Sequence, residues 1–369
     1  MKKVLVVGHI PPPYGGQAIM TQKLLNTEFK NVNFLFLNFS FSHSFREMGR
    51  SSINKFLLLF KYIFKVYLFR FKYRNLILYY IPAGPNKIPI IRDIIFLFFI
   101  RFLFKKKIYH FRAAGLSDYL SGKNFFIKLI AKLTYGSPTI AIQLSELNPP
   151  DGRFLNAKKI YYIPNGIEDQ FNVELSQYKK FQSDKINILF VSVLREDKGL
   201  TWLIKSLKIV RENISSSCEL NIYIIGEFYD VSYEKYIHKL SNDLGLTDII
   251  NFVGSKIGHE KWEYFYNADM FCFPTFFESE SFGNVLIEAM MFELPIITSN
   301  WRAIPEIVTE EVGVVIPVND VDLLAQKIIL LINNPILRIN LGKNARSRYL
   351  HFYNIDNFIN RMQTVFNNI

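Results

Sequence analysis

Two glutamates separated by seven residues stand where a predicted buried strand gives way to a helix. Residues 274–295 read PTFFESESFGNVLIEAMMFELP; the polar turn carries Glu280, and Glu288 falls on the second turn of a helix that begins near Gly283. A helix start offers free backbone N–H groups and a positive dipole end, which suit a phosphate or an anionic leaving group. Hydroxyl groups of a bound sugar or ribose would give the two carboxylates a function there. The alternative is a capped amphipathic helix with two solvated acids.

Three further places carry polar residues beside predicted strand ends. Gly15 and Gly16 follow the first strand and precede a helix, where glycine permits close backbone approach to a phosphate, although a structural turn explains the pair equally well. His110 ends the basic strand KKKIYHF, and Arg112 follows it. Asn165 lies in the string PNG, and because Asn and Gly tolerate unusual backbone angles, a turn is the alternative there.

The sequence gives no support for a metal centre. No group of His, Cys and acidic residues has metal-ligand spacing, and there is no D-x-D string. We therefore expect the chain to use no metal and no cofactor.

Alternating strand and helix signals place these residues in an α/β protein. In the first half, strands are predicted at 4–8, 33–39, 76–81, 107–111, 138–143 and 160–163, and helices at 16–28, 51–73, 89–105 and 123–134. In the second half, strands are predicted at 186–194, 220–226, 249–254, 270–275, 296–299 and 313–316, with helices between them and two more at the end. Short, almost continuous runs of Val, Ile, Leu and Phe are typical of parallel sheets buried on both faces.

The pattern restarts once, which predicts two Rossmann-like domains. We expect them at 1–168 and 185–349, joined by a polar linker at 168–185, with a C-terminal helix at about 350–369 that packs back on the first domain. A cleft between two such domains would face the carboxyl ends of both sheets, where ligands bind in this architecture.

Charge is distributed unevenly along the chain. Residues 1–168 contain 25 Lys and Arg against 7 Asp and Glu, a net charge of +18, whereas the remainder contains 19 and 25, a net charge of −6. This asymmetry indicates an anionic partner for the first half, with nucleic acid and an anionic membrane surface as the two candidates. The two cysteines cannot build a disulfide framework and fit a reducing cytoplasm, and residues 4–8 read as a buried strand and not as a secretory signal.

Two apolar, basic segments are candidates for contact with a membrane. Ser51 to Arg74 includes NKFLLLFKYIFKVYLFRFKYR, and Arg92 to Lys107 reads RDIIFLFFIRFLFKKK. Charges interrupt both, so neither has the roughly 20 apolar residues that a spanning helix needs. The first segment is predicted to be an interfacial amphipathic helix, and the second is predicted to lie mostly in the core. Ordinary helices that cover a sheet are the alternative for both.

The acidic segment resembles the E-x7-E signature of the retaining GT-B glycosyltransferases of family four. The family text is P-S-x-x-E-G-F-G followed by L-E-A-M-A-x-G-x-P; here the turn before Glu280 is two residues longer, which leaves Glu278 as a rival first acid. Ser281 replaces the glycine before Phe282, and Glu293 stands where glycine is common. The resemblance runs from the Gly-Gly loop to the C-terminal helices and implies the GT-B fold, an α/β architecture of two Rossmann-like domains.

The resemblance also implies roles for residues of the second half. Glu280 would hold hydroxyl groups of the donor sugar, and Glu288 would hold the ribose. Lys198, in FVSVLREDKGL, matches the family lysine that holds the donor pyrophosphate. An ammonium group suits that position because negative charge grows on the leaving diphosphate in the transition state. The family arginine five positions earlier is replaced by valine, and Arg195 is the candidate substitute.

The remaining roles come from the same resemblance. The backbone N–H groups of Phe282, Gly283 and Asn284 would bind the diphosphate. His110 matches a family histidine that touches the donor sugar, and Asn165 lies in the family element I-P-N-G. Gly15 and Gly16 match the loop that shapes the donor and acceptor sites, and Pro305-Glu306 matches a family P-E at a helix start.

The expected function is metal-independent, retaining transfer of a sugar from a nucleotide-diphosphate sugar, a UDP-sugar by family frequency. The acceptor is expected to be lipid-linked or a polysaccharide, in bacterial surface-glycan synthesis, bound by the first domain at the inner face of the cell membrane. The membrane surface is preferred over nucleic acid because the basic residues alternate with lipid-like aliphatic side chains. A nucleotide-sugar epimerase, a phosphorylase and a non-catalytic GT-B-like partner subunit or anionic-polymer binder are the alternatives.

Overall fold

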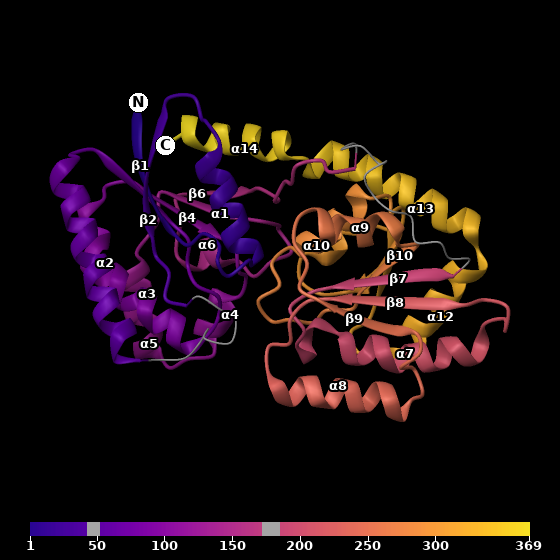
Figure 1. Cartoon of the computed structure of the whole chain (residues 1–369). Helices are drawn as coiled ribbons and strands as arrows, with labels where there is room; N and C mark the ends of the chain where they lie inside the picture. The colour runs from indigo at the N-terminus through magenta and orange to yellow at the C-terminus, as the bar shows by residue number, and fades with distance from the viewer. Residues whose placement is uncertain (43–51, 172–184) are drawn as a thin grey trace. The chain divides into compact units, whose positions relative to one another are not determined.

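The structure is a computed structural model that describes residues 1–42, 52–171 and 185–369, and these divide into two compact units. Unit 1 comprises Met1–Asn165, Glu278–Ser281 and Phe358–Ile369, and unit 2 comprises Gly166–Phe277 and Phe282–Asn357. Each unit contains one six-stranded sheet in which every neighbouring pair of strands is parallel (Figure 1). The prediction of parallel α/β sheets is therefore confirmed for each unit.

Unit 1 is built on the sheet order β2-β1-β3-β4-β5-β6. Its strands are β1 (Lys2–Gly8), β2 (Val32–Asn38), β3 (Leu76–Tyr80), β4 (Lys107–Phe111), β5 (Ile140–Gln143) and β6 (Lys159–Tyr162). Its helices are α1 (Gly16–Asn26), α2 (Ile53–Lys72), α3 (Lys87–Ile100) with the 3-10 turn η2 (Arg101–Leu103), α4 (Leu116–Ser121), α5 (Phe125–Tyr135) and α6 (Asp151–Phe154). All five residues of β3 are buried, as expected for a strand covered on both faces.

Helices cover both faces of this sheet. On one face, α3 lies between α2 and α5 (Figure 1), and the ring of Tyr80 stacks on Phe96 of α3. Successive side chains of a strand point to opposite faces, so Tyr79 faces the other way, where its ring meets Phe366 of α14 (Ile355–Asn367). The Lys2 ammonium group donates to the Phe366 carbonyl at 2.8 Å, which ties the end of the chain to its beginning.

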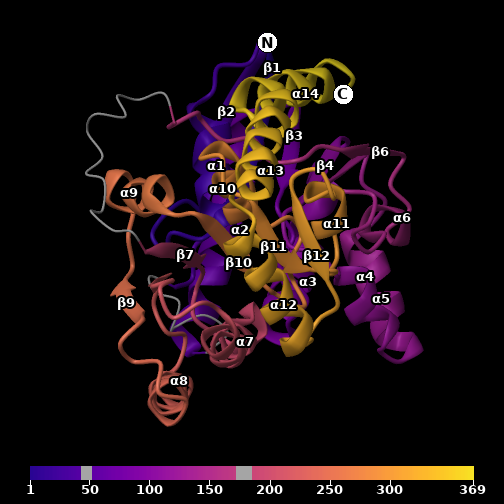
Figure 2. The same cartoon turned by 90° about the vertical axis from the view of Figure 1, so that its right-hand side faces the viewer.

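Unit 2 repeats the plan with the sheet order β12-β11-β10-β7-β8-β9. Its strands are β7 (Ile186–Val191), β8 (Leu220–Ile225), β9 (Ile250–Gly254), β10 (Met270–Phe273), β11 (Ile296–Ser299) and β12 (Gly313–Ile316). Its helices are the 3-10 turn η4 (Glu196–Lys198), α7 (Leu200–Asn213), α8 (Val231–Asp243), α9 (His259–Asn267), α10 (Asn284–Met291), α11 (Ile304–Ile307), α12 (Val321–Asn333), α13 (Pro335–Arg348) and the π-helical turn η5 (Tyr349–Tyr353). Figure 2 shows β10, β11 and β12 side by side, and α12 packs against β11 and β12.

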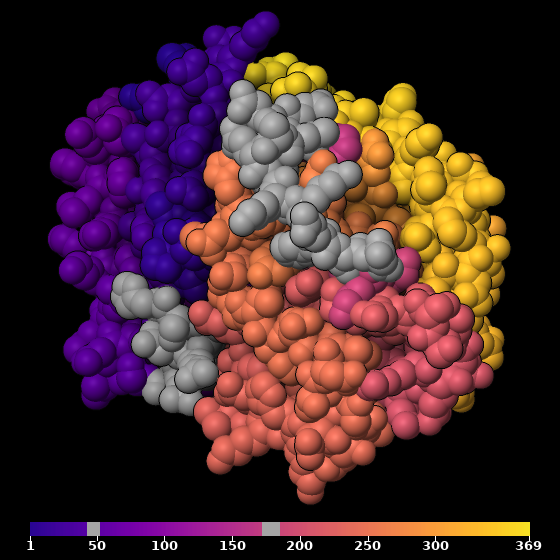
Figure 3. Space-filling model, turned by 45° about the vertical axis from the view of Figure 1, so that its right-hand side comes forward, coloured from indigo at the N-terminus to yellow at the C-terminus, as the bar shows by residue number. Residues whose placement is uncertain are grey.

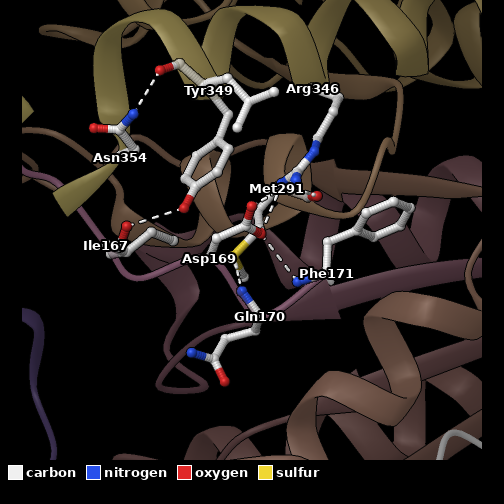
Figure 4. A network of polar contacts seen from close by, with 9 residues as sticks. Ile167, Asp169, Gln170, Phe171, Met291, Arg346, Tyr349 and Asn354 are labelled. Carbon is white, nitrogen blue, oxygen red and sulfur yellow. Dashed lines mark hydrogen bonds and ion pairs between the residues drawn. The ribbon is translucent and has the colours of Figure 1, made fainter. Parts of the chain in front are cut away.

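A polar network fixes the start of unit 2 against its C-terminal helices (Figure 4). The Arg346 guanidinium group donates to the Asp169 carboxylate at 2.8 Å and to the Met291 carbonyl at 3.1 Å. The Tyr349 hydroxyl group donates to the Ile167 carbonyl at 2.9 Å. These contacts anchor the segment that follows Asn165 to α10, α13 and η5. In Figure 3, yellow atoms of the C-terminal region form much of the surface at the right.

Three sequence-based expectations need correction or limitation. The segment Arg92 to Lys107 was expected to lie mostly in the core, but Phe98 and Phe102 are 57% and 66% exposed, so that expectation is wrong for one side of the helix. Helices α4 and α6 were not predicted, because six and four residues are too few for a periodic signal. Residues 172–184 of the expected linker, and Ser51 of the expected first amphipathic helix, lie outside the described residues.

Candidate functional site

The strand order of unit 2 identifies where a ligand would bind. The first strand, β7, has β8 on one side and β10 on the other, so the chain reverses its direction of travel across the sheet between β7 and β10. In open α/β sheets, ligands bind at such a switch point, outside the carboxyl ends of the strands. The loops that leave β7 and β10 there are residues 192–199 and 274–283. They contain five of the predicted site residues: Arg195, Lys198, Glu280, Phe282 and Gly283.

Close backbone contact joins these two loops at Gly199. The φ angle of Gly199 is +90°, and a Cβ atom there would lie 2.1 Å from the Pro274 carbonyl oxygen, so only glycine fits. The Phe276 N–H donates to the Asp197 carbonyl at 2.9 Å, and the Thr275 hydroxyl group donates to the same oxygen at 3.3 Å. Lys198 is therefore held at the carboxyl end of β10 by backbone geometry.

Arg195 and Lys198 share one aromatic neighbour. The Arg195 guanidinium carbon lies 4.7 Å from the ring centroid of Phe277, and the Lys198 ammonium nitrogen lies 4.1 Å from it. Two guanidinium nitrogens of Arg195 also donate to the two Asp197 carboxylate oxygens, at 2.8 Å each. Asp197, which sequence reasoning missed, thus partly neutralises Arg195, and a diphosphate would compete with it for the guanidinium group. The Trp301 indole N–H fixes the loop by donating to the Phe277 carbonyl at 2.8 Å.

Helix α10 begins where the sequence placed a phosphate-binding helix start. Gly283 precedes it with φ +75°, a left-handed conformation that glycine adopts without strain. The first turn carries no acidic side chain and Gly283 provides no side-chain cap, so no carboxylate of the helix's own first turn would repel an anion there. Phe282 is buried with its ring centroid 5.7 Å from that of Tyr353, which anchors the preceding backbone.

Glu288 is a buried carboxylate with one engaged oxygen. Its Oε1 atom accepts from the Lys261 ammonium group at 2.8 Å, and its side chain is 12% exposed. Its buried Oε2 atom has no hydrogen-bond partner among the described residues. Lys261 comes from α9 and stacks over Trp262, with the ammonium nitrogen 4.2 Å from the ring centroid. This arrangement leaves one carboxylate oxygen able to accept from a ligand hydroxyl group.

The two candidate first acids differ in exposure. Glu280 is half-buried, whereas Glu278 is exposed, and both lie in the segment that groups with unit 1. Their contribution to donor binding stays a prediction, with Glu280 as the preferred residue.

In unit 1, three of the predicted residues come together around a tyrosine. His110 Nδ1 and the Tyr79 hydroxyl group form a short hydrogen bond, and Arg112 Nη1 donates to Asn165 Oδ1 at 3.0 Å. Burial lowers the pKa of His110 well below its ordinary value, and the positive charge of Arg112 lowers it further, so the imidazole is neutral at pH 7. Burial raises the pKa of Tyr79 to about 12. Sequence reasoning missed Tyr79, because its role depends on the pairing of two strands.

Gly15 and Gly16 lie apart from that cluster in the chain, in the loop after β1. Gly15 is the residue before α1, and its N–H donates to the Pro13 carbonyl at 2.9 Å. The order of the sheet in unit 1 also changes direction at β1, which has β2 on one side and β3 on the other. The two glycines are therefore at the switch point of their own sheet, as the first predicted strand and helix require.

The described residues also bear on metal binding and on membrane insertion. Across residues 1–42, 52–171 and 185–369, no cluster of three or more His, Cys, Asp or Glu side chains has the arrangement of a metal site. In the same part of the chain, no helix combines the length and apolar composition required to cross a membrane.

Sequence comparisons connect the chain to glycosyltransferases. Residues 173–348 match the family model described as "Glycosyl transferases group 1". The chain is 31% identical over 255 residues to a capsular polysaccharide biosynthesis glycosyltransferase, CapM, of Staphylococcus aureus, covering 66% of this chain and 65% of the relative. It is 28% identical over 192 residues to a phosphatidyl-myo-inositol mannosyltransferase of Mycobacterium leprae, covering 51% and 49%. The matched region thus spans between about half and just under two thirds of these relatives.

Solved structures share the fold along the whole chain. Sucrose-phosphate synthase of Thermosynechococcus elongatus superposes with a TM-score of 0.73 at 18% identity, covering 100% of this chain and 99% of that one. HepE of Anabaena, solved in complex with UDP, gives a TM-score of 0.71 at 16% identity and covers 100% of both chains. Such identities show the fold alone, and the neighbours are GT-B enzymes. Together with the two parallel sheets, they show that the chain has the GT-B fold, and residues 173–348 match the group 1 glycosyltransferase family.

Proposed function

We propose that this protein is a retaining glycosyltransferase that moves a sugar from a nucleotide-diphosphate sugar, preferably a UDP-sugar, to a lipid-linked or polysaccharide acceptor in bacterial surface-glycan synthesis. The observation that carries the proposal is the buried Glu288 carboxylate, with Oε1 held by Lys261 and Oε2 open to a ligand hydroxyl group. It lies on the helix that starts at the switch point of unit 2. The capsule-forming relative and the UDP complex of HepE support the acceptor and donor classes.

In the proposed donor site, each group has one task. Lys198 offsets negative charge that develops on the departing diphosphate, and the backbone N–H groups of residues 282–284 bind its oxygens. Glu288 Oε2 accepts from a ribose hydroxyl group, and Glu280 accepts from hydroxyl groups of the transferred sugar. Arg195 contributes to the diphosphate site only when it exchanges part of its Asp197 contact for a phosphate oxygen.

The proposed reaction needs no metal. The bond between the anomeric carbon and the diphosphate oxygen breaks, and a bond from the acceptor oxygen forms on the same face of the sugar. The proton of the acceptor hydroxyl group passes to the departing phosphate oxygen. Atoms and charge balance, because the products are the glycosylated acceptor and the protonated nucleoside diphosphate.

We propose that unit 1 contacts the acceptor at an anionic membrane surface, on the inner face of the cell membrane. The outer sides of α2, α3 with η2, and α5 carry large apolar residues that are at least 36% exposed, and we name them the three-helix face: Ile53, Phe56, Leu57, Phe60, Phe64, Tyr67, Leu68, Phe71, Ile88, Ile91, Phe98, Phe99, Phe102, Phe125, Phe126, Ile127, Leu129, Ile130 and Leu133. Exposed lysines of α2 and α5 lie among them: Lys61, Lys65, Lys72 and Lys132. Aromatic and aliphatic side chains with flanking lysines suit the boundary of an anionic bilayer.

Calorimetric titration with UDP-, GDP- and ADP-sugars, in buffer with a chelator, tests the donor site. We expect one nucleotide class to bind and Glu288→Gln to weaken it about 10-fold, because one charged hydrogen bond is lost. Glu310→Gln, which changes an exposed glutamate of the same unit, is the matched control and should leave the affinity unchanged. Equal affinity in the wild type and Glu288→Gln, or binding of no donor in the presence of acceptor membranes, would contradict the proposal and favour a non-catalytic partner subunit.

A further inference from the structure

A buried cluster lies at the carboxyl ends of β3 and β4 in unit 1. Tyr79, His110 and Arg112 are 0%, 0% and 6% exposed. The Tyr79 hydroxyl group is hydrogen-bonded to His110 Nδ1, and the two ring centroids are 5.9 Å apart. Arg112 is held by Asn165 at 3.0 Å and lies over the ring of Phe358, with its guanidinium carbon 5.9 Å from the centroid.

The contacts of Tyr79 determine where the imidazole proton resides. Within the described residues, His110 Nδ1 is the only recorded acceptor for the Tyr79 hydroxyl proton. If the imidazole donated instead, this buried hydroxyl proton would have no acceptor, which is costly. The phenol therefore donates to Nδ1, and the neutral imidazole carries its proton on Nε2.

Three N–H groups of this cluster have no protein partner in the described part of the chain. They are His110 Nε2 and the Nε and Nη2 atoms of Arg112, all buried. Buried donors are nearly always hydrogen-bonded in folded proteins, so several such donors in one cluster indicate a missing acceptor. The His110 imidazole is a neutral donor and the Arg112 guanidinium group is a cationic donor. Such a pair can donate to a hydroxyl oxygen of a sugar or to an oxygen of a phosphate.

We propose that Tyr79 is a positioning residue that holds His110 with its proton on Nε2, so that His110 and Arg112 together donate to a hydroxyl oxygen of the transferred sugar. Tyr79 does not touch the ligand and acts through the two donors that it contacts, mainly His110 and also Arg112. Asn165 positions Arg112 in the same way. The inference rests on the proposed function for the identity of the ligand, but the internal arrangement of the cluster can be tested without any ligand.

The first test is nitrogen-15 NMR of the histidine side chains, of which the chain has six. His110→Gln identifies the His110 signals by their loss. In the wild type at pH 7.5, we expect His110 to be protonated on Nε2 and its Nδ1 signal to show an accepted hydrogen bond. In Tyr79→Phe, the Nδ1 signal should move to the value of a free acceptor nitrogen. A proton on Nδ1 in the wild type, or an unchanged Nδ1 signal in Tyr79→Phe, would overturn the proposal.

Tyr109→Phe is the matched control for the loss of a buried hydroxyl group. Tyr109 is the neighbour of His110 in β4 and points to the other face of the sheet, where its hydroxyl group donates to the Tyr135 carbonyl at 2.7 Å. We expect this variant to fold and to leave the His110 signals unchanged.

The second test compares titrations with UDP and with the UDP-sugar that the donor screen selects. Tyr79→Phe should weaken the UDP-sugar about 3- to 10-fold and change UDP by less than about 2-fold, because only the sugar contact is affected. In a His110→Gln background, Tyr79→Phe should weaken the UDP-sugar less than it does in the wild type, because Tyr79 acts mainly through His110. Equal weakening of UDP and UDP-sugar would assign the cluster to the diphosphate and refute a sugar contact. If no nucleotide sugar binds the wild type, the proposed function fails, while the NMR result still decides the role of Tyr79.

Discussion

The outer helices of the two units differ in the side chains that they expose. In unit 1, the three-helix face exposes phenylalanine, leucine and isoleucine among lysines. In unit 2, the corresponding surface carries ion pairs instead. Lys208 pairs with Glu212 at 2.9 Å within α7, and Lys256, in the loop before α9, pairs with Glu260 of α9 at 3.4 Å. Both sets of helices cover a buried parallel sheet, so the fold does not require the difference. The difference fits the proposal that the two units have different partners, a nucleotide sugar for unit 2 and an anionic membrane surface for unit 1.

The polar residues inside the units differ as well. In unit 2, charged groups near the switch point are already paired, as in Arg195 with Asp197 and Glu288 with Lys261. A charged ligand that binds either residue must then replace its protein partner. In unit 1, the buried Arg112 has two N–H groups without a partner among the described residues.

The largest expected effect comes from removing the lysine of the donor site. Lys198→Met should lower kcat/KM about 100- to 1000-fold, because developing charge on the diphosphate loses its cation. Steady-state release of nucleoside diphosphate in the presence of acceptor membranes measures this. Lys205→Met, an exposed lysine of α7, is the control and should behave like the wild type. Comparable activity of Lys198→Met and the control would contradict the proposal that Lys198 of unit 2 stabilises the charge on the leaving diphosphate.

The next effect is on folding. Gly199→Ala should destabilise the protein by about 3 kcal/mol, because its Cβ atom would collide with the Pro274 carbonyl oxygen. Gly245→Ala is a matched control with φ +66° and no atom within 4 Å of the added Cβ, so it should cost only about 1 kcal/mol. Chemical denaturation of both variants measures the difference. Equal destabilisation would show that backbone angle alone, and not contact between the two loops, selects glycine at position 199.

The three-helix face predicts a membrane-binding effect confined to unit 1. Phe60→Ser combined with Phe64→Ser should reduce binding to vesicles of phosphatidylglycerol about 10- to 100-fold. Full burial of one phenylalanine side chain in an apolar phase contributes roughly 1.5–3 kcal/mol to the free energy of binding. Vesicle sedimentation measures the partition. Tyr236→Ser on α8, which alters an exposed aromatic residue of unit 2, should have no effect. Unchanged binding by the double variant, or binding to oligonucleotides and not to vesicles, would contradict the proposal that the three-helix face binds an anionic membrane surface.

The smallest expected effect concerns pH. Burial and then the Arg92 charge lower the pKa of His9 from 6.5 to about 4. Below pH 6.5 the unfolded chain takes up a proton that the folded protein does not, so this contribution to stability is complete above pH 6.5 and is lost as pH falls toward 4. His9→Gln should therefore reduce the loss of unfolding free energy between pH 7 and pH 5 by about 1–2 kcal/mol. Denaturation curves at the two pH values measure it, and an identical pH dependence in the variant would contradict the buried neutral state.

Much of the fold was accessible from the sequence because buried parallel strands leave continuous apolar runs. The strands at 107–111, 296–299 and 313–316 have the predicted bounds, and the helix after Gly283 begins at the predicted place. Contacts that depend on strand order or on distant helices were not accessible. Lys261 reaches Glu288 from another helix, and Tyr79 reaches His110 through the pairing of β3 with β4. The exposed phenylalanines of α3 were wrongly assigned because hydrophobicity alone predicts burial.

The most direct test of the account is a transfer assay with a radiolabelled nucleotide sugar and lipid extracted from bacterial membranes, in buffer with a chelator. We predict that the wild type produces labelled lipid whose new linkage has the anomeric configuration of the donor, and that Glu280→Ala folds normally but produces none. Labelled product of the opposite configuration, or full activity of Glu280→Ala, would contradict the account.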